Sequence, residues 1–192
     1  FCDSRALIPR SPIAELIQNE FAGVFDFAPK QILDLCCGGG CIGIAAAIKY
    51  PHAQVELVDI CKDALALSKK NVSLHRLESR IQTNHSNLFM KVSHKFDLIL
   101  ANPPYVSSEE CDALPAEYSH EPQLGLVSED EGLGLPMSIL KTAGGFLTEN
   151  GVLILEVGYN HLALSERLKD IPLLWLEFGM GGEGVLAITR AE

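Results

Sequence analysis

The sequence predicts an α/β fold in which helices cover both faces of a doubly wound, mostly parallel sheet. Residues 31–36 have the pattern of a buried strand and run into a glycine turn at 37–40, which precedes a helix-forming stretch at 41–48. Strand, glycine turn and helix form the opening unit of such a sheet. Further strand patterns follow along the chain, at residues 54–59, 96–101, 152–157 and 185–189.

The other elements can be predicted in order along the chain. A first helix is expected to begin at Ser11-Pro12, because serine is a preferred N-cap and proline a preferred first helical residue. One apolar stripe of that helix is then formed by Ile13, Leu16, Ile17 and Phe21. The remaining expected elements are helices at 62–74, 137–147 and 160–168 and strands near 81–83 and at 173–178.

The glycine turn and the next strand together predict a nucleoside-containing cofactor. Gly38, Gly40 and Gly43 satisfy the Gly-x-Gly-x-x-Gly spacing, and glycines let a backbone approach a ligand closely. The strand at 54–59 ends in Asp59, roughly 20 residues after the turn, where a carboxylate can accept both hydroxyls of a ribose. A dinucleotide and S-adenosylmethionine both fit this pattern. Asp34 precedes the turn, where its carboxylate suits a sulfonium-bearing amino acid better than a pyrophosphate.

Asn102-Pro103-Pro104-Tyr105 follows the strand at 96–101 directly. Two consecutive prolines remove two backbone donors and hold the chain extended, so the neighbouring carbonyls are left to accept hydrogen bonds from a ligand. Asn102 adds a side-chain acceptor and Tyr105 a flat ring that can stack. This arrangement suits a planar NH2 group, either an amide or the exocyclic amine of a base. A rigid turn without a ligand is the alternative for the tetrapeptide taken alone.

These motifs resemble those of the HemK-type N5-glutamine methyltransferases. The residues that carry the resemblance are 34–43, Asp59 and 102–105, within a similarity that extends from about Leu7 to Arg190. Three segments are most similar to the branch that acts on large-subunit ribosomal protein L-three: residues 7–17, the cysteine-flanked glycine turn at 36–41, and residues 115–126. The turn departs from the usual Thr-Gly-Ser-Gly of the family, because Cys37 and Gly39 replace hydroxyl-bearing residues.

The resemblance implies a seven-stranded, Rossmann-like class I sheet with an antiparallel last strand, and S-adenosylmethionine as cofactor. It implies a catalytic set for the amide, which is Asn102, Pro103, Pro104 and Tyr105. It implies a cofactor-binding set, which is Asp34, Cys36, Cys37, Gly38, Gly39, Gly40, Asp59, Asn87, Leu88 and Asn102. Relatives in the family carry a small helical domain before the catalytic one. The chain begins with Phe1, so we expect a single catalytic domain over residues 1–192 without that helical domain.

Composition narrows the class of partner. The chain has 192 residues and a formal net charge of −10, and we see no cluster of Lys or Arg of the kind that binds nucleic acid. An acidic surface suits a basic protein, and ribosomal proteins are basic. No run of 18 apolar residues predicts a membrane span. None of the six cysteines forms a Cys-x-x-Cys pair, so we expect no metal and a reducing, cytoplasmic compartment.

Several alternatives stay open from the sequence. A release factor is the other protein substrate of the family, and an adenine-N6 methyltransferase would use the same slot for a flipped base. A nicotinamide oxidoreductase fits the glycine turn but leaves Asn102-Pro103-Pro104-Tyr105 unexplained. A binding module without activity is a third class. The long irregular stretch at 106–136 is expected to form a substrate-facing lid, in which Glu121-Pro122 contacts substrate or anchors the loop.

Overall fold

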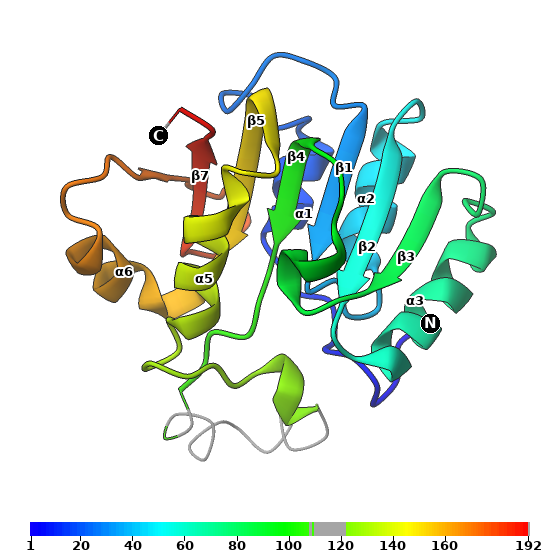
Figure 1. Ribbon diagram of the computed structural model, residues 1–192, viewed down its shortest axis with the longest axis horizontal. Coiled ribbons are helices and arrows are strands. Elements are labelled where there is room, and N and C mark those ends of the chain that lie inside the picture. The colour runs from blue at the N-terminus through cyan, green and yellow to red at the C-terminus, as the bar shows by residue number, and fades with distance from the viewer. Residues whose placement is uncertain (108, 110–121, 192) are drawn as a thin grey trace.

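A seven-stranded sheet forms the centre of the molecule (Figure 1). The computed structural model describes residues 1–107, 109 and 122–191. In that part of the chain the strand order is β3-β2-β1-β4-β5-β7-β6. The strands are β1 (Gln31–Leu35), β2 (Gln54–Asp59), β3 (Ile81–His85), β4 (Phe96–Ala101), β5 (Leu147–Glu156), β6 (Leu174–Trp175) and β7 (Val185–Thr189).

Helices pack on both faces of this sheet. The α-helices are α1 (Ile13–Gln18), α2 (Cys41–Lys49), α3 (Lys62–Leu74), α5 (Gly134–Ala143) and α6 (His161–Arg167). Short 3-10 helices are η1 (Leu88–Lys91), η3 (Gln123–Gly125) and η4 (Gly158–Asn160). In Figure 1, α5 and α6 lie in front of the sheet, and α1 and α2 lie behind it.

Alternation along the strands explains the two helical layers. Ile32 and Leu98 belong to the apolar cluster that includes the buried residues of α1 and α2. Their strand neighbours Leu33 and Ile99 belong to the cluster that includes the buried residues of α5 and α6. All four side chains are fully buried. Strands that are apolar on both faces are typical of parallel sheets covered on both sides.

The predicted topology is confirmed. Strands β1 to β5 are parallel to one another, whereas β7 runs antiparallel to both β5 and β6. The chain builds β1, β2 and β3 outward in one direction and then returns to β4 on the other side of β1. Strand order therefore reverses between β1 and β4. In sheets of this kind ligands bind at the carboxyl ends of the strands beside that reversal.

Some element boundaries differ from the prediction. The helix at 62–74 has the predicted bounds. The helix expected at 137–147 instead spans Gly134–Ala143, because the two glycines that follow disfavour a helix and Leu147 already pairs with Phe96. Helix α1 begins at Ile13, one residue after the predicted Pro12, and the strand expected at 173–178 is shortened to Leu174–Trp175.

Candidate functional site

A cavity of about 890 Å³ lies at the carboxyl ends of the strands, beside the reversal of strand order. Most of the residues predicted for the site lie on its wall: Cys36, Cys37, Gly38, Gly39, Asp59, Asn87, Leu88, Asn102, Pro103, Pro104 and Tyr105. The predicted Asp34 and Gly40 are not among the wall residues and lie deeper in the protein. The structure thus brings the two predicted residue sets together in one cavity.

The glycine loop between β1 and α2 forms one wall. Its turn is closed by hydrogen bonds from the Cys37 N–H to the Val58 carbonyl (3.0 Å) and from the Gly40 N–H to the Cys37 carbonyl (2.7 Å). Gly40 has a φ of 78°, and a Cβ on it would lie 3.0 Å from the Leu57 side chain. A glycine is therefore needed there both for backbone conformation and for space. Burial raises the pKa of the Cys37 thiol, which keeps it protonated and unreactive.

Asp59 joins the glycine loop to the end of β2. Its Oδ2 accepts a hydrogen bond from the Gly38 N–H (2.8 Å), and its Oδ1 accepts one from the Cys61 N–H (2.8 Å). Each carboxylate oxygen has a further lone pair, and the side chain lies on the cavity wall. The carboxylate is fixed by main-chain donors on two loops while it keeps acceptor capacity for a ligand.

Asp34 does not have the predicted position facing a ligand. Its side chain is 1% exposed, and Oδ2 accepts the Gly43 N–H (2.8 Å) in the first turn of α2. Among the described atoms, Oδ1 has no hydrogen-bond partner. Burial, with a smaller contribution from Asp59, raises the pKa of Asp34 to about 7, against the opposing effect of the Gly43 hydrogen bond. The residue therefore holds helix α2 against β1 from beneath the loop.

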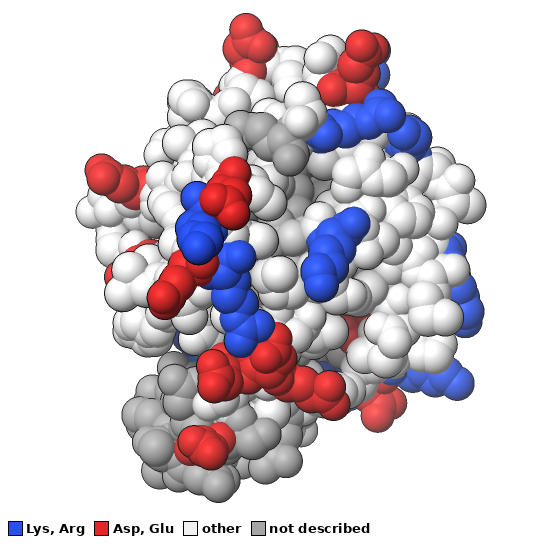
Figure 2. Space-filling view, turned by 60° about the vertical axis from the view of Figure 1, so that its left-hand side comes forward, with Lys and Arg blue, Asp and Glu red and all other residues white. Residues whose placement is uncertain are grey.

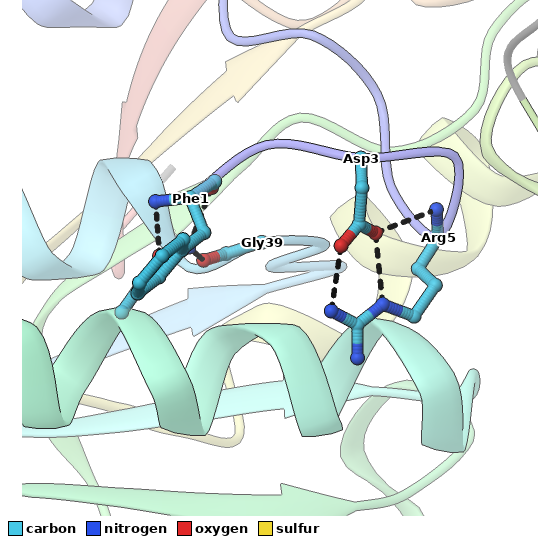
Figure 3. A network of polar contacts seen from close by, with 5 residues as sticks. Phe1, Asp3, Arg5 and Gly39 are labelled. Carbon is cyan, nitrogen blue, oxygen red and sulfur yellow. Dashed lines mark hydrogen bonds and ion pairs between the residues drawn. The ribbon is translucent and has the colours of Figure 1, made fainter.

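The segment before α1 crosses the glycine loop (Figure 3). Asn71 of α3 donates from Nδ2 to the Gly39 carbonyl (2.9 Å) and to the Phe1 carbonyl (3.1 Å), and its Oδ1 accepts from the Phe1 amino group (2.6 Å). Asp3 and Arg5 form an ion pair in the same segment. This segment contributes Arg5 and the residues up to Pro12 to the cavity wall.

Asn87 and Leu88 lie on the wall after β3, where contacts to the adenine base were predicted. Asn87 is exposed, and Leu88 is half-buried with a φ of 45°. The preceding Ser86 donates its N–H to the Asp59 carbonyl (3.1 Å) and accepts the Lys91 N–H at its Oγ (2.9 Å). These bonds hold the turn beside the glycine loop, and the base contacts themselves stay a prediction.

Asn102-Pro103-Pro104-Tyr105 forms a further part of the wall and is anchored on a residue that sequence reasoning missed. Glu156 ends β5, is 5% exposed, and reaches the cavity wall. Its Oε2 accepts the Ser11 hydroxyl (2.5 Å) and its Oε1 accepts the Tyr105 hydroxyl (3.2 Å). Burial raises the pKa of Glu156, and hydrogen bonds from Ser11, Tyr105 and Asn102 oppose that rise. The only signal in the sequence was a lone acid at the end of an apolar strand.

Tyr105 is held from several sides. Its backbone carbonyl accepts a hydrogen bond from Asn160 Nδ2 (2.5 Å). A Cβ on Gly132 would overlap the same carbonyl oxygen, and a Cβ on Gly158 would lie 2.6 Å from the tyrosine ring. Both glycines have positive φ values. The backbone of two neighbouring turns therefore packs directly against Tyr105, which fixes the ring position. Stacking of that ring on a substrate amide stays a prediction.

Part of the predicted lid lies outside the described residues, including Glu121 and most of the segment 115–126. The described part of this stretch is bonded to Val106, which follows the motif at 102–105. The Val106 N–H donates to the Leu126 carbonyl, and the Ser128 N–H donates to the Val106 carbonyl (both 2.9 Å). Pro122 and Leu124 lie on the cavity wall. The described end of this segment therefore borders the site.

The described residues contain no group of three or more His, Cys, Asp or Glu side chains suited to a metal ion. No described helix combines the length and the apolar character that crossing a bilayer requires. On the face shown in Figure 2, Lys and Arg side chains are interspersed with Asp and Glu.

Comparison with known proteins agrees with this geometry. Residues 15–117 match the model of the Methyltransferase small domain. Ribosomal protein uL3 glutamine methyltransferases of Francisella tularensis subsp. tularensis and Xanthomonas campestris pv. campestris are 48% and 45% identical over 193 residues. The matches cover 99% of this chain and 62% of each relative, so the chain spans less than two thirds of their length. These names confirm the resemblance to glutamine methyltransferases.

Solved structures show the same fold at low sequence identity. A methyltransferase from Pyrococcus furiosus has a TM-score of 0.70 at 16% identity, over 99% of this chain and 87% of that one. The T. thermophilus 16S rRNA methyltransferase RsmC, in complex with AdoMet and guanosine, has a TM-score of 0.65 at 19% identity, over 95% of this chain and 43% of that one. Since the family model covers more than half of the chain and the fold is that of methyltransferases, this protein belongs to the Methyltransferase small domain family.

Proposed function

We propose that the protein transfers a methyl group from S-adenosylmethionine to the side-chain amide nitrogen, N5, of a glutamine in the large-subunit ribosomal protein uL3. The observation that carries this proposal is the position of Asn102 and Pro103, two adjacent hydrogen-bond acceptors on the wall of the cavity that the glycine loop and Asp59 also line. The names of the two relatives support the choice of substrate.

The cavity fits S-adenosylmethionine. Its volume of about 890 Å³ lies within the range of small-molecule sites, with room for a cofactor and a substrate side chain. Asp59 has unused lone pairs for ribose hydroxyls, Gly38 and Gly39 admit a ligand close to the backbone, and Asn87 and Leu88 lie where a base would be held. When bound, the cofactor supplies an electrophilic methyl group on a sulfonium, whose departure leaves a neutral thioether.

The residues of this chain bind and orient the amide. An amide nitrogen is a weak nucleophile because its lone pair is delocalised into the carbonyl. The Asn102 Oδ1 and the Pro103 carbonyl accept its two N–H groups, which aims the nitrogen at the methyl group and favours the positive charge that develops on it. Among its described residues, the cavity wall carries no lysine or histidine that could act as a base. Positioning therefore accounts for catalysis better than proton abstraction by such a base before transfer, and the methylated nitrogen then releases one proton to water.

Charge supports a protein substrate. The net charge of −10 attracts a basic ribosomal protein and repels nucleic acid phosphates. The same slot would accept a release-factor glutamine, or an adenine amine in DNA or RNA. The three substrates differ in charge and in the group methylated, so one transfer assay separates them.

The test is transfer of labelled methyl from S-adenosylmethionine to purified uL3, release factor and duplex DNA offered in parallel. Label on a glutamine side chain of uL3 is expected, and label confined to release factor or DNA would contradict the proposal. Asn102→Ala should lower kcat by about 10²-fold or more and leave cofactor affinity within a few-fold, since it removes an acceptor used during transfer. Asn150→Ala is the matched control, because Asn150 is exposed near the start of β5 and should leave turnover unchanged.

A further inference from the structure

Glu156 is a carboxylate buried in an apolar environment. The three residues before it, Leu153, Ile154 and Leu155, are fully buried, and Glu156 itself is 5% exposed. A carboxylate is costly to bury unless hydrogen bonds compensate for the lost water. Here the compensation comes from side chains of distant segments, which also contribute to the cavity wall.

The sheet register brings Asn102 next to Glu156. Ala101 of β4 pairs with Leu155 of β5, so the next residue on each strand, Asn102 and Glu156, follows the same pair at the carboxyl edge. Neighbouring strands lie about 4.8 Å apart, which is within reach of two short polar side chains. The Asn102 side chain therefore lies beside the Glu156 carboxylate, whose two oxygens already accept the hydroxyls of Ser11 and Tyr105.

The chemistry of these groups fixes which way the Asn102 amide points. An ionised carboxylate can only accept hydrogen bonds, and an asparagine side chain has one donor end, NH2, and one acceptor end, Oδ1. The NH2 of Asn102 must therefore face Glu156. Its Oδ1 then points away from Glu156, toward the cavity that both residues line. The two ends of an asparagine amide are similar in shape, so only such a partner distinguishes the two orientations.

We propose that Glu156 is a positioning residue that makes the site select glutamine over glutamate, by holding the Asn102 amide with its acceptor end toward the substrate. The inference rests on the proposed function, because it assigns the specificity of the same slot. A glutamine NH2 donates to the Asn102 Oδ1. A glutamate carboxylate has only acceptor oxygens, so it could form no hydrogen bond with the Asn102 Oδ1. Sites built to pair with a substrate N–H reject analogues that lack it by ~10²-fold or more.

Replacing Glu156 should release this constraint. In Glu156→Leu the Asn102 amide loses its acceptor and can rotate, so that its NH2 faces the cavity and pairs with a carboxylate. In Glu156→Gln one oxygen still accepts the Asn102 NH2, and the new NH2 can donate to Ser11, whose hydroxyl is also an acceptor. The two variants therefore separate the orientation of the amide from the charge of Glu156.

The test measures binding, by calorimetry, of two peptides: one that spans the glutamine labelled in the transfer assay and one in which glutamate replaces that glutamine. Wild type and Glu156→Gln should prefer the glutamine peptide by ~10²-fold or more, whereas Glu156→Leu should lose at least ten-fold of that preference. A preference that survives in Glu156→Leu would overturn the proposal. Equal losses in Glu156→Gln and Glu156→Leu would also overturn it, since charge alone would then explain the selectivity.

A second measurement needs no substitution of Glu156. In the wild-type protein, the Asn102 NH2 should exchange its hydrogens more slowly than the exposed Asn150 NH2, with the NMR signals assigned through Asn102→Ala. Exchange as fast as that of Asn150 would refute the proposed orientation, even if Glu156→Leu does not fold. A protected Asn102 NH2 in a protein that methylates no glutamine would refute the proposed function instead. The two failures are thus distinguishable.

Discussion

Gly158 offers a direct test of how tightly Tyr105 must be held. Gly158 begins η4, has a φ of 52°, and lies so close to Tyr105 that a Cβ would be 2.6 Å from the ring. Ordinary contacts of a Cβ begin at 3.4 Å, so in Gly158→Ala the ring or the turn must move by about 0.8 Å. Tyr105 donates to Glu156 and follows the two prolines of the slot, so this movement would reach the substrate end of the cavity.

The expected magnitude follows from two contributions. A left-handed backbone conformation costs a non-glycine residue roughly 1–2 kcal/mol. Overpacking against a ring in a fixed position costs about 1–3 kcal/mol more. For a chain of this length each kcal/mol lowers the melting temperature by about 2–4 °C. A displacement on the order of 1 Å at a reacting group can cost ~10²-fold in rate, so kcat should fall by about 10- to 10²-fold.

The assay compares Gly158→Ala with Gly23→Ala. Gly23 has a φ of 85°, and a Cβ on it would meet no other atom within 4 Å, so its alanine variant carries the backbone cost without a clash. We expect both variants to be less stable in thermal unfolding, and only Gly158→Ala to lose methyl transfer. Cofactor affinity, measured by calorimetry, should stay within a few-fold in both. Wild-type turnover in Gly158→Ala would refute the argument that the position of Tyr105 controls catalysis.

Two further predictions concern the carboxylates near the glycine loop. Asp34→Asn should flatten the pH dependence of the unfolding free energy, measured in urea titrations. The fold raises the pKa of Asp34 from 3.8 to about 7, so the contribution of Asp34 to the unfolding free energy is full below about pH 4 and is lost as the pH rises through about 7. The loss amounts to roughly 4 kcal/mol. An unchanged slope in that range would contradict the assignment. Asp59→Ala should weaken S-adenosylmethionine binding by ~10²-fold in calorimetry, because two backbone N–H groups and the ribose hydroxyls all lose their hydrogen-bond acceptor. An affinity within three-fold of wild type would exclude Asp59 as the ribose acceptor.

Local patterns were enough to predict the fold class and the parts of the cavity wall that lie at the carboxyl ends of the strands. The glycine loop, Asp59 and the motif at 102–105 are each contiguous in sequence, and a parallel sheet brings the carboxyl ends of its strands together without further information. Helix α3 was also predictable, because its length and apolar periodicity are independent of tertiary contacts.

Long-range pairing was not predictable in the same way. Ser11 and Glu156 are 145 residues apart, and nothing near either residue indicates the other. Ser11 was predicted to cap a helix, and its Oγ does accept the Ile13 N–H (3.2 Å), but the second bond of the same hydroxyl, which it donates to Glu156, was not predicted. The position of Asp34 was also not predictable from the sequence. Alternation along β1 places the Asp34 side chain on the face that α2 covers. Its hydrogen bond of 2.8 Å to the Gly43 N–H depends on how α2 packs against that face.

Asp59 and Glu156, two of the carboxylates on the cavity wall, are held in different ways. Asp59 is fixed by backbone N–H groups of two loops, so no single side-chain replacement elsewhere removes its donors. Glu156 is fixed by the side chains of Ser11 and Tyr105, either of which one substitution can remove. The end of the cavity proposed for the cofactor is therefore set by the fold itself, whereas the end proposed for the substrate is set by a small network of side chains. Substrate preference can consequently change between proteins of this fold while the cofactor end keeps its geometry.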